Sequence, residues 1–136
     1  MTTLAQVRDG LEARLDTIDG LRVYKHVPGD AHYPAAVVFP PTHADYRDDL
    51  GAGSYTHQWI VMLFVPATVD RQQLDLYDFL DRTGPSSIFA VVEADRTLGG
   101  LNVDARVMSA QDPLDLGEMA GAQVYQRAVV IEVIVS

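Results

Sequence analysis

The sequence contains no cysteine, and this absence excludes a disulfide framework, a thiolate metal site and a cysteine nucleophile. It has one lysine, Lys25, and its 10 basic residues face 19 acidic ones, so the formal net charge is −9. A chain of this sign lacks the clustered Lys and Arg with which proteins grip nucleic acid. No apolar run approaches the roughly 18–20 residues that are needed to span a bilayer.

The first twenty residues, MTTLAQVRDGLEARLDTIDG, are interrupted by charges and do not have the apolar segment of a signal peptide. We therefore expect a protein that is made in the cytoplasm and does not enter a membrane. With 136 residues, of which 48% are hydrophobic, the chain is long enough for one domain with its own core.

The N-terminal segment predicts an amphipathic helix over 3–18, with Thr2 or Thr3 as its cap and Gly20 as its end. Gly10 lies inside this helix and weakens it by about 1 kcal/mol relative to alanine. The apolar stripe of the predicted helix consists of Leu4, Val7, Leu11, Leu15 and Ile18.

The rest of the chain predicts five strands and two more helices. The strands are expected at 21–27, 35–41, 55–65, 101–110 and 122–136, and the helices at 69–84 and 85–97. The segments 42–54 and 111–121 are rich in polar and turn-forming residues and are expected to be loops. This order predicts an α+β fold: a single domain over 1–136 with a mainly antiparallel or mixed sheet and helices packed on one face.

The stretch EADRTLGG, residues 93–100, raises the question of a phosphate-binding loop. Such a loop places its glycines before a helix, where backbone N–H groups and the helix dipole attract anions. Here Gly99 and Gly100 follow a predicted helix and precede a predicted strand, so we expect a helix stop and a tight turn. Glu93 and Arg96, three residues apart, are expected to pair on the helix surface.

The histidines and serines form no recognisable catalytic or metal-binding motif. His32, His43 and Asp45 are the residues that could meet as a metal site, but their spacing matches no known ligand pattern. Ser86 and Ser87 follow Pro85 at a helix start, where serine bonds the backbone. We expect no cofactor, no metal and no catalytic residue.

Taken in order, several segments resemble the tail terminator, or tail completion, proteins of long-tailed bacteriophages, particularly the short forms in phages of actinobacteria. The resemblance covers essentially the whole chain, and it lies in the combined order and spacing of its segments. They are TIDGLRVYKHVPGD, YPAAVVFPP, HADYRDDLGAGSYTHQW, LYDFLDRTGPSSI, VVEADRTLGG and the last strand after GEMAGAQVYQ.

The resemblance implies a structural virion protein at the head-proximal end of the tail, with no enzymatic activity. Proteins of this family form a six-fold ring that caps the tail tube, ends its polymerisation and joins it to the head-side connector. The partners implied are further copies of the chain, the tail tube protein and the connector protein. DNA would pass through the ring without specific binding, and an acidic channel is compatible with that passage.

A strand that is apolar on both faces near its end, at 55–65, favours contact with a second subunit. The loop at 42–54 and the start of this strand are the candidate subunit interface, and the turn at 111–121 is a candidate contact to the tube or connector. The candidate interface residues are Tyr46, Arg47, Asp48, Leu50, Tyr55, His57 and Trp59. Two alternatives stay open: a head–tail connector or adaptor ring protein, and a small hydrolase or ligand-binding domain with a pocket from 26–34 and 42–57.

Overall fold

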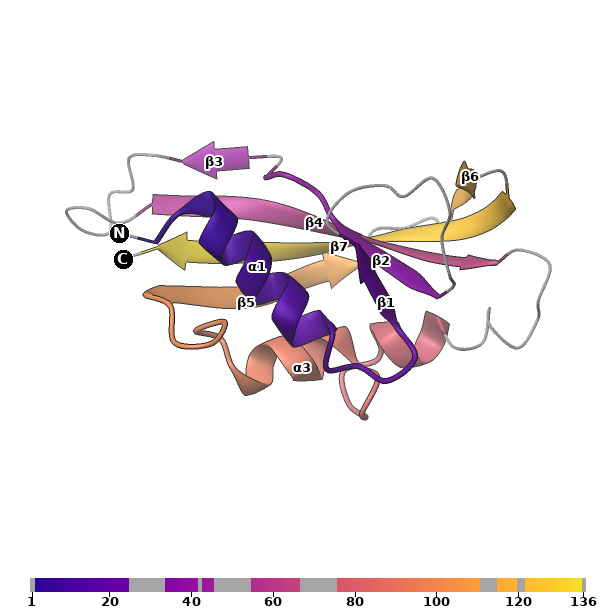
Figure 1. Ribbon diagram of the computed structural model, residues 1–136, viewed down its shortest axis with the longest axis horizontal. Coiled ribbons are helices and arrows are strands. Elements are labelled where there is room, and N and C mark those ends of the chain that lie inside the picture. The colour runs from indigo at the N-terminus through magenta and orange to yellow at the C-terminus, as the bar shows by residue number, and fades with distance from the viewer. Residues whose placement is uncertain are drawn as a thin grey trace.

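The computed structural model describes residues 2–24, 34–41, 43–45, 55–66, 76–110, 115–119 and 122–135, and these are shown in Figure 1. Side chains are described for these residues except at 43–45, 55, 66, 115–119 and 122–124. None of the helices in this part of the chain is long and apolar enough to cross a membrane.

The described residues form a seven-stranded sheet with the described helices on one side, in agreement with the predicted α+β class. The main path through the sheet is β1-β2-β4-β7-β5, while β3 pairs with β4 and β6 pairs with β7. Of the pairings described, β1–β2 is parallel and the others are antiparallel. The strands are β1 (Arg22–Tyr24), β2 (Ala35–Val38), β3 (His43–Asp45), β4 (Tyr55–Pro66), β5 (Val103–Ala110), β6 (Asp115–Met119) and β7 (Ala122–Val135).

The long strands β4 and β7 form the centre of the sheet. They pair without interruption from Tyr55 opposite Val135 to Pro66 opposite Val124. The outer side of β4 is shared by β2 and β3, and the outer side of β7 is shared by β5 and β6. Every other strand except β1 is therefore placed by its pairing with one of these two.

Two helices, α1 (Leu4–Leu15) and α3 (Ile88–Ala94), and a helical turn at 76–80 cover one face of the sheet. In Figure 1, α1 crosses in front of the strands and α3 lies near β5. The Arg14 guanidinium ties the two helices together, because its Nε and Nη2 donate to the Val91 carbonyl at 3.2 and 2.9 Å. The helices and the sheet enclose one continuous core, whose largest buried side chains include Trp59, Leu11, Leu15, Leu63, Ile88 and Ile131.

The predicted start of α1 is confirmed. The Thr3 hydroxyl accepts from the Gln6 N–H at 3.2 Å, while the Gln6 side chain accepts from the Thr3 N–H at 2.8 Å, which completes a capping box. The helix ends at Leu15, three residues before the predicted end, and Gly20 follows at a φ of 83°. Ile18 remains in the core because the turn after the helix folds it back onto the sheet.

Gly10 has a packing role that the helix propensity did not reveal. A Cβ at this position would lie 2.8 Å from the Leu98 Cβ and 2.9 Å from the Leu98 carbonyl oxygen, closer than real Cβ atoms approach. The absence of a side chain therefore lets α1 pass directly against the turn that contains Leu98. The glycine that weakens the isolated helix is required by its tertiary contact.

Several predicted boundaries change in the structure. The expected loop at 42–54 contains β3, and the expected loop at 111–121 contains β6. Both strands are short and lack an apolar alternation, and they form because the long β4 and β7 offer free backbone groups beside them. The helix expected at 69–84 is helical at 76–80, with 69–75 outside the described residues, and the helix expected at 85–97 covers 88–94.

Replacing Gly10 with alanine is expected to destabilise the protein. Overpacking against Leu98 costs typically about 1–3 kcal/mol, which exceeds the gain of about 1 kcal/mol in helix propensity. Urea unfolding followed by circular dichroism measures the difference in the free energy of unfolding.

The exposed Ala13 on the same helix provides the control, because Ala13→Gly changes the backbone term alone. Both substitutions should lower stability, although they change glycine content in opposite directions. A Gly10→Ala variant more stable than the wild type would contradict the close approach of the helix and the turn.

Candidate subunit interface

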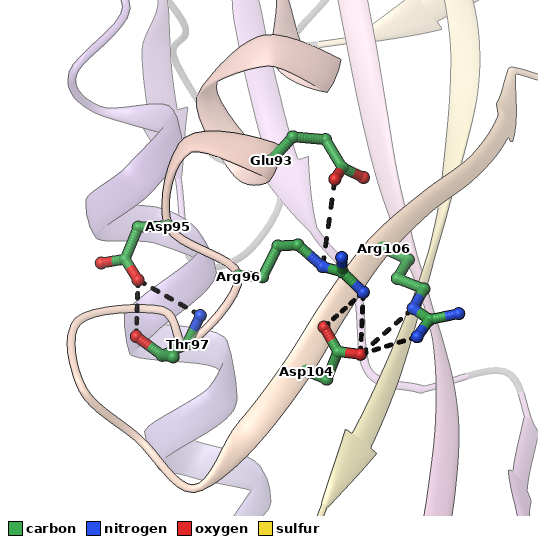
Figure 2. Close-up of polar contacts among 6 residues, drawn as sticks. All are labelled: Glu93, Asp95, Arg96, Thr97, Asp104 and Arg106. Carbon is green, nitrogen blue, oxygen red and sulfur yellow. Dashed lines mark hydrogen bonds and ion pairs between the residues drawn. The ribbon is translucent and has the colours of Figure 1, made fainter.

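The turn at 95–100 connects α3 to β5 and is held by its own hydrogen bonds, some of which Figure 2 shows. The Asp95 carboxylate accepts from the Thr97 hydroxyl at 2.5 Å, from the Thr97 N–H at 3.2 Å and from the Gly99 N–H at 3.0 Å. The Thr97 hydroxyl, followed by these backbone donors, lowers the pKa of Asp95 below its usual value. The turn's own carboxylate thus occupies N–H groups that a bound phosphate would need.

The backbone of this turn confirms the predicted tight corner. Gly99 and Gly100 have φ values of 88° and 91°, and Leu98 before them has a φ of 53°. Three successive residues in the left-handed region reverse the chain from α3 into β5, and two of them are glycines because other residues are strained there. Leu98 adopts this left-handed conformation, and its side chain is buried in the core.

A cluster of charged side chains fastens this turn to the edge of β5 (Figure 2). The Asp104 carboxylate accepts from Arg96 Nη2 at 2.7 and 2.8 Å and from Arg106 Nη2 at 2.9 Å. The Glu93 carboxylate lies 3.9 Å from Arg96 Nε, so the predicted surface pair is confirmed. Because these side chains are about one-third to one-half exposed, each ion pair contributes only about 0–1 kcal/mol.

The contact of Arg96 with Asp104 was not foreseen from the sequence, because helix spacing rules stop at four residues. The main chain shows why they meet: the Ala105 N–H donates to the Arg96 carbonyl at 2.8 Å. This bond lays the turn along the outer edge of β5. Asp104 and Arg106, two residues apart on the strand, then share the sheet face that lies away from the helices.

The structure places His57 and Trp59, two of the candidate interface residues, inside the core. Their side chains are 0% and 2% exposed, and their rings meet edge-to-face at 6.2 Å. The Trp59 Nε1–H donates to His57 Nδ1 at 3.4 Å, which requires a neutral imidazole at that nitrogen. Burial lowers the pKa of His57 from its ordinary value of 6.5.

The alternation of β4 explains this placement. Residues 57, 59, 61, 63 and 65 point toward the helices, whereas Thr56, Gln58, Ile60 and Met62 lie on the opposite face and are partly exposed. The side chains of this strand that a second subunit could reach are therefore those on the opposite face. Tyr55 is described in its backbone alone, and the interface prediction for Tyr46, Arg47, Asp48 and Leu50 lies outside the described residues.

The sheet face opposite the helices carries a second apolar cluster. Ala35, Val37 and Phe64 are buried in it, and Tyr24, Phe39 and Met62 are partly exposed around them. This cluster is formed by β1, β2 and β4, and it lies on the side of the sheet from which the described helices are absent. The sheet is therefore apolar on both faces near the end of β4, as the sequence of this strand predicted.

A further apolar feature lies where the end of β5 approaches the helical turn at 76–80 and the start of α3. This groove encloses about 320 Å³, and we refer to it as the edge groove. Its lining residues are Phe79, Leu80, Arg82, Ile88, Phe89, Val107, Met108, Ser109, Ala110 and Val129. Met108 is 55% exposed and sits where the register of β5 shifts between Val107 and Ser109.

The segment that forms one wall of the edge groove is held by a buried serine. The Ser87 hydroxyl donates to the Asp81 carbonyl and accepts from the Ala90 N–H at 3.0 Å, so it caps α3. The expectation that this serine bonds the backbone at a helix start is confirmed. The Arg82 guanidinium lies 5.0 Å above the ring of Phe89, which keeps a positive charge at the groove.

The metal hypothesis concerns residues whose side chains the structure does not describe. His32 lies outside the described residues, and His43 and Asp45 are described as backbone in β3. Within the described part of the chain, no group of three or more His, Cys, Asp or Glu residues could hold a metal ion.

Neither a scan against protein-family models nor a search of curated proteins found a match to this chain.

The buried His57 is expected to make stability depend on pH. Its folded-state pKa lies below 6.5, so above that pH both states are neutral and no dependence arises. As pH falls below 6.5, His57 binds a proton in the unfolded chain but stays neutral in the folded chain. The free energy of unfolding then decreases by up to about 1.4 kcal/mol per pH unit until the folded-state pKa is reached.

Urea unfolding at pH 7.5, 6.5, 5.5 and 5.0 measures this slope, with His57→Gln as the comparison. Glutamine can still accept from Trp59 through its carbonyl oxygen and does not titrate. The variant should be less stable near neutral pH, with a flatter profile below 6.5. An identical slope in both proteins would show that His57 is not the group responsible.

Proposed function

We propose that this protein is a structural component of a phage tail: a ring-forming terminator that caps the tail tube and joins it to the head-side connector. The proposal assigns it no catalysed reaction. It places several copies of the chain side by side around a channel through which DNA passes.

The observation that carries this proposal is the sheet with helices on one face and a second apolar cluster on the other. Met62 and Phe39 are partly exposed in that cluster, as are Ile60 and Ile134 elsewhere on the same face. Partly exposed apolar surface of this kind gains stability when a partner covers it. A subunit whose apolar surface is buried by neighbouring copies is more consistent with a ring than with an independent monomer.

The specific role of tail terminator is proposed because the order of segments along the chain resembles that of tail terminators. The α+β fold with one helical layer agrees with the fold that the resemblance implies. The net charge of −9 supports the DNA channel, because like charge keeps the DNA backbone from adhering to the wall.

Capping of growing tail tubes tests the role directly. Purified protein added to polymerising tail tube protein is expected to stop growth at one end, and electron microscopy should show a ring there. A small molar amount should suffice, because each tube needs one ring. An Arg8→Gln variant, changed at a half-exposed side chain on α1, is the matched control and should cap equally well.

Three other outcomes are informative. Binding to the connector protein without any effect on tube growth would assign the chain to the neighbouring connector ring. Failure to bind either protein, or a ring whose channel is lined mainly by Lys and Arg, would overturn the proposal.

A further inference from the structure

An exposed aromatic side chain lies on the helical turn at 76–80. Tyr77 is 73% exposed, whereas the opposite side of this turn packs in the core. The Asp81 N–H donates to the Tyr77 carbonyl at 2.9 Å, so Asp81 follows one helical turn later on the same side. Asp78 is exposed beside them, and we refer to Tyr77, Asp78 and Asp81 together as the knob.

The edge groove begins on the same turn, two residues after Tyr77. Phe79, Leu80 and Arg82 belong to its lining, which is otherwise uncharged. The groove encloses about 320 Å³, and a cavity of roughly 150 Å³ already admits a benzene ring, so the ring of a tyrosine fits this space. In its own chain Tyr77 lies outside the groove, since it is exposed and is not one of the lining residues. Tyr77 is therefore available to the groove of another copy.

A β-bulge brings Met108 into the groove lining. Val107 pairs with Ile131 and Ser109 with Val130, which leaves Met108 as the extra residue of β5. A bulge redirects a side chain that the regular alternation of the strand would place on the other face. Met108 is 55% exposed, and the flexible methionine side chain adapts its shape to a contacting surface. The groove thus has an adaptable apolar residue where it meets solvent.

Charge is divided between the knob and the groove. The knob carries two acidic side chains, and the groove carries Arg82, whose guanidinium lies 5.0 Å above the ring of Phe89. Aromatic residues, methionine and arginine are also the types that are enriched at protein interfaces. One patch of the surface therefore contains a projecting ring next to a hollow, and acids next to a base. Such a patch is complementary to a copy of itself.

We propose that two copies of this chain pair about a two-fold axis, with Tyr77 of each copy in the edge groove of the other. Asp78 and Asp81 of each copy then approach Arg82 of the other copy. Such a contact is isologous and closes at two copies, whereas a ring requires a contact that repeats head to tail. The pairing therefore goes beyond the proposed tail function and is tested separately from it.

Analytical sedimentation tests the pairing. The wild-type protein is expected to form dimers whose fraction rises with concentration. Tyr77→Ser should weaken dimerisation by at least about tenfold, because a buried tyrosine anchor contributes a large share of an interface's binding energy. Leu4→Ser, which removes a large apolar side chain that is 41% exposed on α1, is the matched control and should dimerise like the wild type. A wild type that stays monomeric at every concentration, or equal weakening by both variants, would overturn the inference.

Charge reversal supplies an independent measurement. Arg82→Glu reverses the groove, and the combined Asp78→Lys and Asp81→Lys variant reverses the knob; each should weaken dimerisation by about tenfold or more, because like charges then face each other. An equimolar mixture of the two proteins should recover dimers, since every altered surface of a mixed pair meets an opposite charge. Arg8→Glu on α1 is the control and should leave dimerisation unchanged. No recovery on mixing, or unchanged dimerisation of both reversed proteins, would count against the contact.

Disulfide trapping locates the contact, and the natural absence of cysteine makes every introduced thiol unique. Tyr77→Cys and Met108→Cys proteins are prepared separately, mixed under mild oxidation and analysed by mass spectrometry for the mixed disulfide. The Met108→Cys copy keeps its own tyrosine, which still holds the mixed pair together. Trapping should be at least about tenfold faster than for the control pair of Leu4→Cys with Met108→Cys, because thiols held in contact react at a high effective concentration. Equal trapping of both pairs, or no mixed disulfide with Tyr77→Cys, would overturn the inference.

A chain that carries both Tyr77→Cys and Met108→Cys distinguishes a two-fold contact from a head-to-tail one. At high protein concentration a two-fold contact gives covalent dimers with two disulfides and no larger product. Covalent products of more than two copies would overturn the two-fold pairing. An internal disulfide as the sole product would place residue 77 at its own groove and would overturn it as well.

The outcomes separate this inference from the proposed function. A Tyr77→Ser variant that no longer dimerises but still caps tail tubes would support both the pairing and the role as a terminator. A wild type that dimerises and caps no tube would support the pairing and overturn the role. Loss of tube capping by Tyr77→Ser, with capping by the wild type, would place this patch in the ring and overturn the two-fold pairing.

Discussion

The antiparallel pairing of β4 with β7 is the interaction on which the rest of the structure depends. Its twelve residue pairs are continuous, and each strand offers its other edge to two further strands. Because backbone N–H and C=O groups away from water must be paired, these edges recruit short segments such as β3 and β6 that have little strand propensity of their own.

Alternation along these two strands decides which side chains can meet a partner. On β4 the odd-numbered residues from 57 to 65 enter the core under α1 and α3, and His57 and Trp59 are among them. The even-numbered residues form the opposite face, which is apolar over part of its area and partly exposed. A single-residue shift of register would exchange the two faces, which is why the burial of Trp59 is a sensitive indicator of the register.

The corner at 95–100 joins the helical layer to the sheet through a close approach of α1 to the turn as well as through charged side chains. Gly10 lets α1 touch the turn at Leu98, and the left-handed residues of the turn bring the chain back into β5. The carboxylate of Asp95 satisfies the turn from within. This stretch resembles an anion-binding loop in composition but acts as a structural turn. It follows a helix C-terminus, which repels anions, and its N–H groups already donate to Asp95.

Much of the fold could be predicted because its signals are local. The capping box at Thr3, the glycines of the turn and the alternation of β4 each depend on residues within a few positions of one another. The strands β3 and β6 could not be predicted, because their pairing depends on β4 and β7 and not on their own residues. The edge groove was also missed, since it brings together residues 79–89, 107–110 and 129 from three separate parts of the chain.

The sequence by itself determined the helix caps, the positions of the long strands, the acidic surface and the exclusion of thiol chemistry, because composition and short-range periodicity suffice for these. Tertiary structure alone decided that Gly10 is a contact, that His57 and Trp59 are core residues, and that an apolar groove with one arginine lies beside the end of β5. Those features arise where elements distant in the chain pack together, and no local pattern encodes the distance between them.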